Sequence, residues 1–431
     1  MAHIDVKTNR TGSNWKRPFF TIWIGQAVSL LGSQLVQFAL IWWLTKLTES
    51  AVVLTTATLV GILPRVVLGP FVGALVDRWD RRKIMALADS GIALATLLLA
   101  YLFFINRAAI WVVYVILFFR ALGSGFHSPA MTSSTSLMVP HEHLTRIQGL
   151  NQTLQNGLNI VSAPLGAILL DVLSVQGILA IDVISALFGI TPLFFIAIPR
   201  PDIKTLSQKE RLVESVWEDF KIGLRYINRW AGLKFIMVMA VSINMIVTPA
   251  FALLPLLVRK YFEGGALQLG WLESSFSIGA FAGGLLLSLW GGFQKKILTS
   301  QMGLIILSLG MAAIAFIPAS RFPYAIAAFF LIGTALPLAN GPINAILQST
   351  VDPGMQGRVF TLTGSFASAV SPLGLIVAGP LAEVFNIQLW YIGGGIMTLL
   401  FGIGGLFSKA LMTFEDNPHQ PREKISHPVV T

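Results

Sequence analysis

The sequence predicts an all-α membrane protein with twelve transmembrane helices arranged as two six-helix, pseudo-symmetric halves. Three observations support this fold class: only 12% of the 431 residues are charged, apolar runs recur along the whole chain, and one long polar connection divides them. A soluble domain carries about 25% charged residues, because its surface faces water. The hydrocarbon core of a bilayer is about 30 Å thick, and one helix of about 20 apolar residues crosses it.

The twelve predicted spans follow one another at short intervals. The first apolar run is too long for the core of a signal peptide and lacks a small-residue cleavage site, so it is assigned as a span. Backbone groups in lipid must be hydrogen-bonded within their own segment, which makes each run helical. The predicted spans are 19–45, 51–76, 84–105, 110–138, 146–171, 177–198, 233–258, 267–291, 297–317, 323–349, 359–382 and 388–411.

The connection at residues 199–232 is the only long one between spans, and it separates six spans from six. Apolar residues recur in it at helical spacing from Leu212 to Ile227, which predicts an amphipathic helix at the inner membrane surface. The polar end of the chain is predicted to be disordered from Phe414. The predicted parts are therefore an N-terminal segment 1–18, a first half 19–198, the linker 199–232, a second half 233–411 and a tail 412–431.

The basic residues predict the orientation of the chain in the membrane. With the N-terminus inside, the inner segments hold 23 Lys and Arg residues and the outer loops hold 5. Because basic residues accumulate in cytoplasmic loops, both termini are expected in the cytoplasm. The same placement accounts for the net charge of +10 without a nucleic-acid partner.

Two proline patterns recur in the two predicted halves. Pro129 and Pro140 flank the end of the fourth span, and Pro342 and Pro353 stand eleven residues apart at the end of the tenth. A Pro-Leu-Gly sequence occurs in the fifth span and again in the eleventh, at 164–166 and 372–374. Parallel repeats of this kind are typical of major facilitator transporters, whose substrate sites lie near the middle of the membrane.

Three ionisable residues inside the spans are candidates for proton coupling, because burying a charge in a bilayer is costly. Arg120 lies near the midplane, and Glu273 and Asp182 lie in the outer halves of their spans. A carboxyl group in apolar surroundings binds a proton more readily than in water. The alternatives are structural: backbone carbonyls around Arg120, an Arg partner or a position at the membrane edge for Glu273, and a capping or interface role for Asp182.

Other polar groups within the spans are interpreted as structural. Arg65 and Asp89 lie on consecutive spans, where an ion pair between them is expected. His127 could titrate, but a lone histidine is more often a satisfied structural residue.

Amide side chains at helical spacing predict one wall of a substrate cavity, and the alternative is hydrogen bonding between helices. Neutral donors and acceptors suit a bulky, weakly polar or cationic substrate. The candidate cavity residues are Gln26, Gln34, Gln37, Asn151, Gln155, Asn159, Asn244, Asn340 and Asn344.

Several classes of chemistry are excluded or disfavoured. The chain has no Cys, which excludes disulfides and thiol-ligated metals. No Walker motif occurs, and the glycines at 279–284 lie within a span with no strand before them, so they are interpreted as helix packing. We expect no catalytic residues, no cofactor and no metal, and therefore no enzyme.

A motif between the second and third spans resembles the signature of the major facilitator superfamily, G-x-L-a-D-r-x-G-r-k-x. The matching residues are Gly73, Asp77, Arg78, Arg81 and Arg82. Asp80 stands where the signature has its second Gly. The resemblance implies that Asp77 faces the N-terminus of the eleventh span, whose dipole attracts an anion. The residues expected there are Gly357 and Arg358.

Further segments resemble the macrolide-efflux branch of that superfamily. They are 14–17, 23–30, 68–70, 76–78, 126–130, 181–182 and 357–360. The branch belongs to a group of drug:proton antiporters that also contains siderophore exporters. The resemblance implies an exporter in a bacterial cytoplasmic membrane, with protons and a small hydrophobic substrate as its partners. We expect the protein to be a monomer.

Three functions remain open on the sequence alone. The first is a multidrug or macrolide exporter that works by alternating access and confers antibiotic resistance. The second is a dedicated exporter of one natural product, such as a siderophore. The third is a membrane receptor or lipid-handling protein that does not transport.

Overall fold

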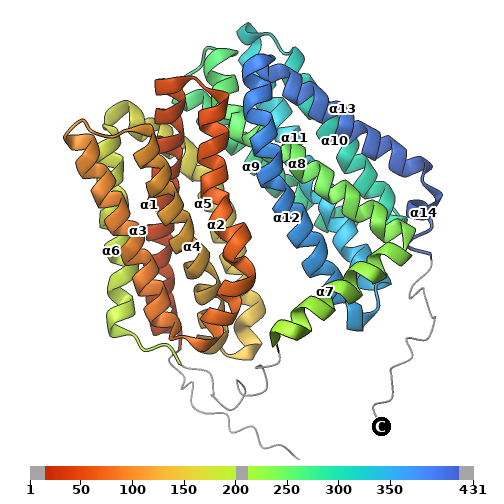
Figure 1. Cartoon of the computed structure of the whole chain (residues 1–431), viewed down its shortest axis with the longest axis horizontal. Helices are drawn as coiled ribbons and strands as arrows, with labels where there is room; N and C mark the ends of the chain where they lie inside the picture. The colour runs from red at the N-terminus through yellow and green to blue at the C-terminus, as the bar shows by residue number, and fades with distance from the viewer. Residues whose placement is uncertain (1–14, 200–211, 417–431) are drawn as a thin grey trace, which may run out of the picture. The chain divides into compact units, whose positions relative to one another are not determined.

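The computed structural model describes residues 15–199 and 212–416, and nearly all of these residues are helical (Figure 1). No strand occurs within those two ranges. The helices are α1 Lys16–Thr48, α2 Ala51–Arg78, α3 Arg81–Phe104, α4 Ile110–Met138, α5 Leu144–Val172, α6 Val175–Phe195, α7 Leu212–Arg229, α8 Ala231–Lys260, α9 Ala266–Trp290, α10 Lys296–Phe316, α11 Phe322–Thr350, α12 Pro353–Val384, α13 Ile387–Phe407 and α14 Lys409–Met412.

Twelve long helices, α1–α6 and α8–α13, correspond to the twelve predicted spans. In the described part of the chain, eleven of them are long and apolar enough to cross a membrane. The twelfth is α5, which is 29 residues long but carries many amide side chains. The predicted all-helical membrane fold is therefore confirmed, and α5 is its least apolar long helix.

The chain divides into two compact units. Unit 1 comprises Met1–Trp43 and Val60–Ser207, and unit 2 comprises Leu44–Leu59 and Gln208–Thr431. In unit 1, α3 packs against α4 and α6, and in unit 2, α10 packs against α11 and α13. Helices α3 and α10 are each the third long helix of their own half, so helices in equivalent places form equivalent pairs.

The repeated Pro-Leu-Gly sequence occupies matching packing positions in the two units. A Cβ atom on Gly166 of α5 would lie 2.9 Å from the Phe38 side chain of α1. A Cβ atom on Gly374 of α12 would lie 2.3 Å from the Met245 carbonyl oxygen of α8. Both glycines therefore allow the fifth long helix of a half to approach the first, which supports the predicted repeat.

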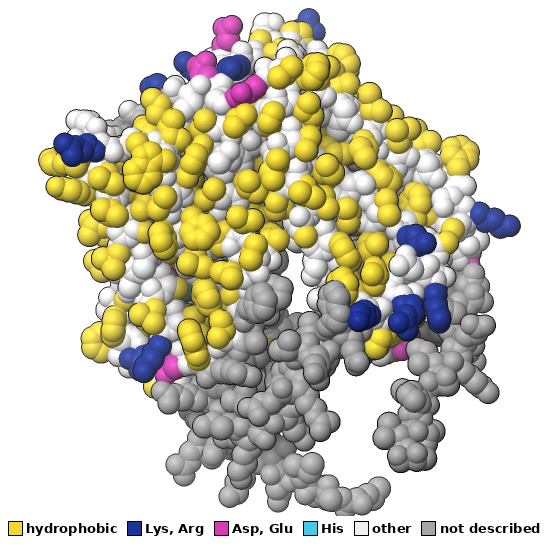
Figure 2. Space-filling model, in the orientation of Figure 1, with side chains coloured by type: hydrophobic (Ala, Val, Ile, Leu, Met, Phe, Trp, Pro, Cys, Tyr) yellow, Lys and Arg dark blue, Asp and Glu magenta, His cyan; other side chains and the backbone are white. Residues whose placement is uncertain are grey.

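The surface of the described chain is apolar over the helices. Figure 2 shows hydrophobic side chains covering much of the visible face, with Lys and Arg gathered near its margins. Large apolar side chains stay exposed along the spans, including Phe104, Trp111, Phe195 and Phe407. An exposed apolar surface of this extent fits lipid contact.

The predicted amphipathic helix corresponds to α7, which packs against α12. The rings of Phe220 and Phe366 lie 6.1 Å apart, and the backbone N–H of Asp352 donates to the Tyr226 hydroxyl at 3.4 Å. The amphipathic helix α7 is thus hydrogen-bonded to the N-terminus of α12.

The end of the described chain is packed, where the sequence predicts disorder from Phe414. The Phe414 side chain is buried, and its ring centroid lies 4.6 Å from that of Trp230. The Glu415 carboxylate accepts hydrogen bonds from the backbone N–H groups of Lys296 and Ile297 at the beginning of α10. The disorder predicted for residues 414–416 is therefore wrong, because an apolar ring and a helix cap hold them.

Candidate functional site

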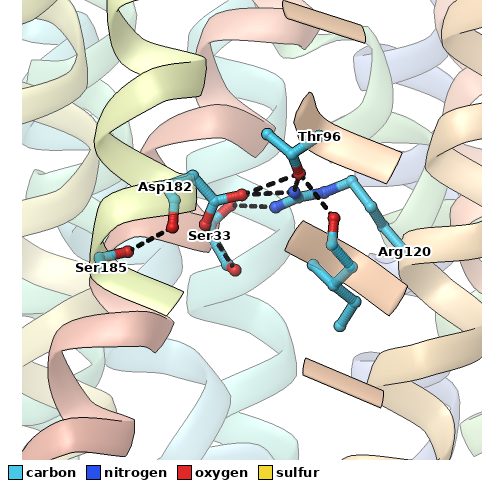
Figure 3. Close-up of polar contacts among 6 residues, drawn as sticks. Ser33, Thr96, Arg120, Asp182 and Ser185 are labelled. Carbon is cyan, nitrogen blue, oxygen red and sulfur yellow. Dashed lines mark hydrogen bonds and ion pairs between the residues drawn. The ribbon is translucent and has the colours of Figure 1, made fainter. Parts of the chain in front are cut away.

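A buried ion pair between Arg120 of α4 and Asp182 of α6 lies at the centre of a polar cluster in unit 1 (Figure 3). Arg120 Nη1 lies 2.5 Å from Asp182 Oδ2, and the two residues are only 7% and 1% exposed. The hydroxyl of Thr96 on α3 lies 3.0 Å from the same carboxylate oxygen and accepts from Arg120 Nη1. Side chains from α3 and α4 thus converge on one carboxylate oxygen of α6.

Helix α1 completes this cluster. The Ser33 hydroxyl donates to Asp182 Oδ1 at 3.0 Å, and the Ser33 carbonyl accepts from Arg120 Nη2 at 3.3 Å. The close approach of α1 and α6 depends on Gly32, since a Cβ atom there would lie 2.1 Å from Ser185 Oγ. Both carboxylate oxygens have donors, so the ionised pair is well satisfied within the apolar bundle. We call Ser33, Thr96, Arg120 and Asp182 the Arg120 layer.

A second buried polar cluster contains Asp89 of α3 and His127 of α4. Gln26 of α1 donates from Nε2 to Asp89 Oδ2 at 2.9 Å and to the Gly189 carbonyl of α6 at 3.2 Å. His127 Nε2 lies 3.4 Å from Asp89 Oδ1. We call Gln26, Asp89, His127 and Gly189 the Asp89 layer.

The structure changes the interpretation of two residues. The ion pair expected between Arg65 and Asp89 is wrong within the described chain, because Asp89 faces His127 and Gln26 and the Arg65 side chain is exposed. Helix α3 packs against α4 and α6, which brings Asp89 to His127. The structural alternative for Arg120 also needs revision, since its main partner is a carboxylate and one backbone carbonyl is secondary.

Glu273 lies on α9 in unit 2, so it belongs to a different compact unit from the other two proton-coupling candidates. Its side chain is partly buried, and its backbone carbonyl accepts from Ser277 Oγ at 2.9 Å. Its carboxylate has no ion pair or hydrogen bond within the described ranges. The Arg-paired alternative for Glu273 therefore finds no support in unit 2.

The candidate cavity amides fall into two groups. Four of them form hydrogen bonds within a unit. Asn151 accepts from Trp23 at 2.7 Å, and Gln34 accepts from Ser162 at 2.9 Å. Asn244 donates to the Ala240 carbonyl of its own helix at 3.0 Å. Gln26 is the fourth, as part of the Asp89 layer. The other five side chains are exposed, namely Gln37, Gln155, Asn159, Asn340 and Asn344, and Asn159 also has an interaction partner.

The signature motif lies at the end of α2 and the start of α3. The side chains of Gly73, Asp77 and Arg78 lie outside the described residues, as does the predicted contact of Asp77. In unit 2, Gly357 is exposed near the start of α12, and Arg358 Nη1 lies 3.4 Å from Met355 Sδ. Arg81 is partly buried.

Arg82 has a contact that the sequence did not predict. Its Nη2 donates to the Phe194 carbonyl at 2.5 Å and its Nε donates to the Leu193 carbonyl, both in the last turn of α6. Asp80 caps the N-terminus of α3 by accepting from the Arg82 backbone N–H at 3.1 Å. A cation at a helix C-terminus satisfies free carbonyls and the helix dipole.

Replacing Arg82 with glutamine is expected to loosen the end of α6. Hydrogen bonds to charged groups contribute about 1.5–3 kcal/mol each, so a loss of about 1–3 kcal/mol in stability is expected. Thermal unfolding of the purified protein in detergent measures the change, with exposed Lys83→Gln as the matched control. Equal unfolding temperatures for the Arg82 and Lys83 variants would contradict the capping role.

Comparison with known proteins places these features in a family. The sequence family described as Major Facilitator Superfamily matches residues 22–375. The chain is 35% identical over 391 residues to Macrolide efflux protein A of Streptococcus pyogenes, covering 91% of this chain and 96% of that protein. It is 25% identical over 409 residues to the Multidrug efflux pump Tap of Mycolicibacterium fortuitum, covering 92% and 97%.

The fold also matches solved structures. A structure described as that of a bacterial metal transporter superimposes with a TM-score of 0.66 at 13% identity, covering 90% of this chain and 98% of that one. An identity this low shows a shared fold alone.

Proposed function

Because the chain belongs to the major facilitator superfamily, we propose that it is a proton-coupled secondary exporter of small hydrophobic or amphiphilic compounds of the macrolide type. The observation that carries this proposal is the 35% identity to a macrolide efflux protein along 91% of the chain. The chain is a membrane transporter and not an enzyme. Export would proceed by alternating access, with the proton gradient as the energy source.

The exposed amides support a weakly polar substrate. Exposed polar groups on membrane spans are unfavourable against lipid, so they are expected to face water or a ligand. Asn340 and Asn344 are four residues apart on α11, and Gln155 and Asn159 are four apart on α5, so each pair lies on one helix face. We propose that each of these faces offers neutral hydrogen-bonding groups to a substrate.

Transport driven by an imposed pH gradient tests this function. Purified protein in proteoliposomes with an acidic lumen should accumulate a radiolabelled macrolide, and nigericin should abolish the accumulation by collapsing the gradient. A panel of compounds that includes a siderophore identifies the substrate class. Absence of gradient-driven accumulation for every compound would overturn the proposal and favour a receptor or lipid-handling role.

Glu273 is proposed as the principal proton-coupling carboxylate, because it is a carboxylate on a span without a charged partner in the described ranges. Glu273→Gln mimics the protonated state, so it is expected to keep macrolide counterflow and lose gradient-driven accumulation. Exposed Glu263→Gln is the matched control. If Glu273→Gln still accumulates macrolide and Asp182→Asn does not, Asp182 is the coupling site instead.

We propose that the chain lies in a bacterial cytoplasmic membrane with both termini inside, which is supported by the 23 basic residues in the segments assigned to the inside. Reporter fusions after Lys296 are expected to read as cytoplasmic, and fusions within residues 262–268 as external. Light scattering of the purified protein tests the proposed monomer. The opposite reporter pattern at either position would contradict the proposed topology.

A further inference from the structure

The two buried polar clusters of unit 1 are built on one spacing. Each of four helices contributes one residue to the Arg120 layer and another, seven positions away, to the Asp89 layer. The pairs are Ser33 and Gln26 on α1, Thr96 and Asp89 on α3, Arg120 and His127 on α4, and Asp182 and Gly189 on α6. Seven residues are two helical turns, so the layers lie about 10 Å apart along the bundle.

The direction of each helix agrees with this stacking. The lower residue number of α1 and α3 belongs to the Asp89 layer, whereas the lower number of α4 and α6 belongs to the Arg120 layer. Successive spans of this topology make α1 and α3 run opposite to α4 and α6. The two layers are therefore superposed polar levels of one four-helix bundle.

The two layers differ in how their charge is balanced. In the Arg120 layer, the carboxylate of Asp182 faces a guanidinium that stays protonated in proteins. The Asp89 layer holds a carboxylate, an imidazole, an amide and a backbone carbonyl. It is electrically neutral only when Asp89 or His127 carries an additional proton, and an uncompensated buried charge is costly.

The contact between Asp89 and His127 also lacks a hydrogen bond in the described part of the chain. His127 Nε2 is buried and makes no hydrogen bond in the described ranges, although Asp89 Oδ1 lies 3.4 Å away. Buried side-chain polar atoms without a partner are uncommon and call for an explanation. A proton held between these two atoms would close the gap with a hydrogen bond.

We propose that Asp89 and His127 form a proton-binding site that is loaded and emptied during transport, in addition to Glu273. The site takes a proton from water on one side of the membrane and releases it to water on the other. The neutral groups in contact with the site are the Gln26 amide on α1 and, through it, the Gly189 carbonyl on α6. The nearest charged groups are Asp182 on α6 and Arg120, two turns away on α4. On α2, the Arg65 side chain is exposed.

The electrostatic link between the layers gives the site a role in the cycle. Asp89 and Asp182 interact repulsively across their separation. Loading the Asp89 layer with a proton therefore removes the repulsion between these two carboxylates. This inference rests on the proposed proton-coupled export, and its test separates the two claims.

The first measurement needs no transport. The unfolding temperature of purified protein without substrate is followed from pH 5 to pH 8 for wild type and His127→Gln. A group whose proton affinity differs between the folded and the unfolded protein makes the unfolding free energy depend on pH. The difference in unfolding temperature between wild type and His127→Gln is expected to change across this pH range. For the exposed control His141→Gln, the difference from wild type should stay constant. A constant difference for His127→Gln would overturn the proton-binding site.

The second measurement places the site in the cycle. Each coupled proton contributes a factor of about ten in accumulation per pH unit, by the equivalence of one pH unit and 1.36 kcal/mol. With a gradient of one pH unit, His127→Gln and Asp89→Asn are expected to accumulate about tenfold less macrolide than wild type and to retain counterflow. The matched carboxylate control is exposed Glu142→Gln. Wild-type accumulation in both variants would overturn the proposal.

The outcomes remain separable if one part fails. If wild type shows no gradient-driven accumulation, the proposed function fails, and the unfolding measurement still decides whether the pair binds a proton. If His127→Gln does not reach the membrane, Asp89→Asn replaces it in both measurements, because an asparagine oxygen can still accept from Gln26.

Discussion

Replacing Arg120 with leucine is expected to destabilise unit 1 strongly, because it leaves Asp182 buried without its cation. Breaking a buried ion pair by removing one partner costs about 3–5 kcal/mol. Asp182 is 1% exposed, so water cannot replace the guanidinium without a rearrangement of α6. The measurement is thermal unfolding in detergent together with the yield of folded protein from membranes.

A double variant separates two contributions to the free energy of unfolding: the penalty for leaving Asp182 buried without a cation, and the stabilisation by the Arg120–Asp182 ion pair. Replacing a buried pair with apolar residues of similar volume is often close to neutral. Arg120→Leu with Asp182→Leu is therefore expected to recover most of the stability that Arg120→Leu loses, although Ser33 and Thr96 lose a partner. Exposed Arg107→Leu controls for removing a cation. A double variant less stable than Arg120→Leu would show that the pair itself stabilises the fold.

The transmembrane architecture could be predicted from the sequence because the bilayer imposes simple rules. Apolar runs of sufficient length must be helical, and short loops leave few choices for their order. Helix α5 is the exception among the twelve long helices. Its amide side chains make it less apolar than the other spans, although it is 29 residues long. The sequence predicts this span at 146–171, and the first copy of the Pro-Leu-Gly repeat lies within it.

The partners of the intramembrane charges could not be predicted in the same way. The sequence shows that Arg120 and Asp182 lie inside spans, but which helices are neighbours depends on tertiary packing. Proximity along the chain suggested that Asp89 pairs with Arg65, whereas α3 packs against α4. The seven-residue spacing of the two layers was present in the sequence and becomes meaningful only once these four helices are known to adjoin.

The second half shows a different limit of sequence interpretation. The loop before α10 resembles a degraded signature motif without an acidic residue, at Gly291–Lys296. In the structure an acidic side chain does lie beside this loop, since the Glu415 carboxylate accepts hydrogen bonds from the backbone N–H groups of Lys296 and Ile297. A motif search along consecutive residues cannot detect a carboxylate that is more than a hundred positions away.

Close packing of α9 against α11 predicts a sharp contrast between two adjacent glycines. A Cβ atom on Gly283 would lie 2.4 Å from the Thr334 carbonyl oxygen, while one on Gly284 would meet nothing within 4 Å. Small residues allow membrane helices to approach closely, and here the obstacle is backbone, which cannot turn aside as a side chain can. The glycine-rich stretch predicted to serve helix packing does so in the structure.

Gly283→Ala is therefore expected to lower stability by about 1–3 kcal/mol, the usual cost of overpacking a core. Gly284→Ala is expected to be neutral or to stabilise by up to about 1 kcal/mol, because alanine favours helix over glycine. Thermal unfolding in detergent compares the two variants under one condition. Gly279→Ala should resemble Gly283→Ala, since its Cβ atom would lie 2.1 Å from the Phe330 carbonyl oxygen. If Gly283→Ala and Gly284→Ala unfold at the same temperature, α9 and α11 are not held at the distance that the structure shows.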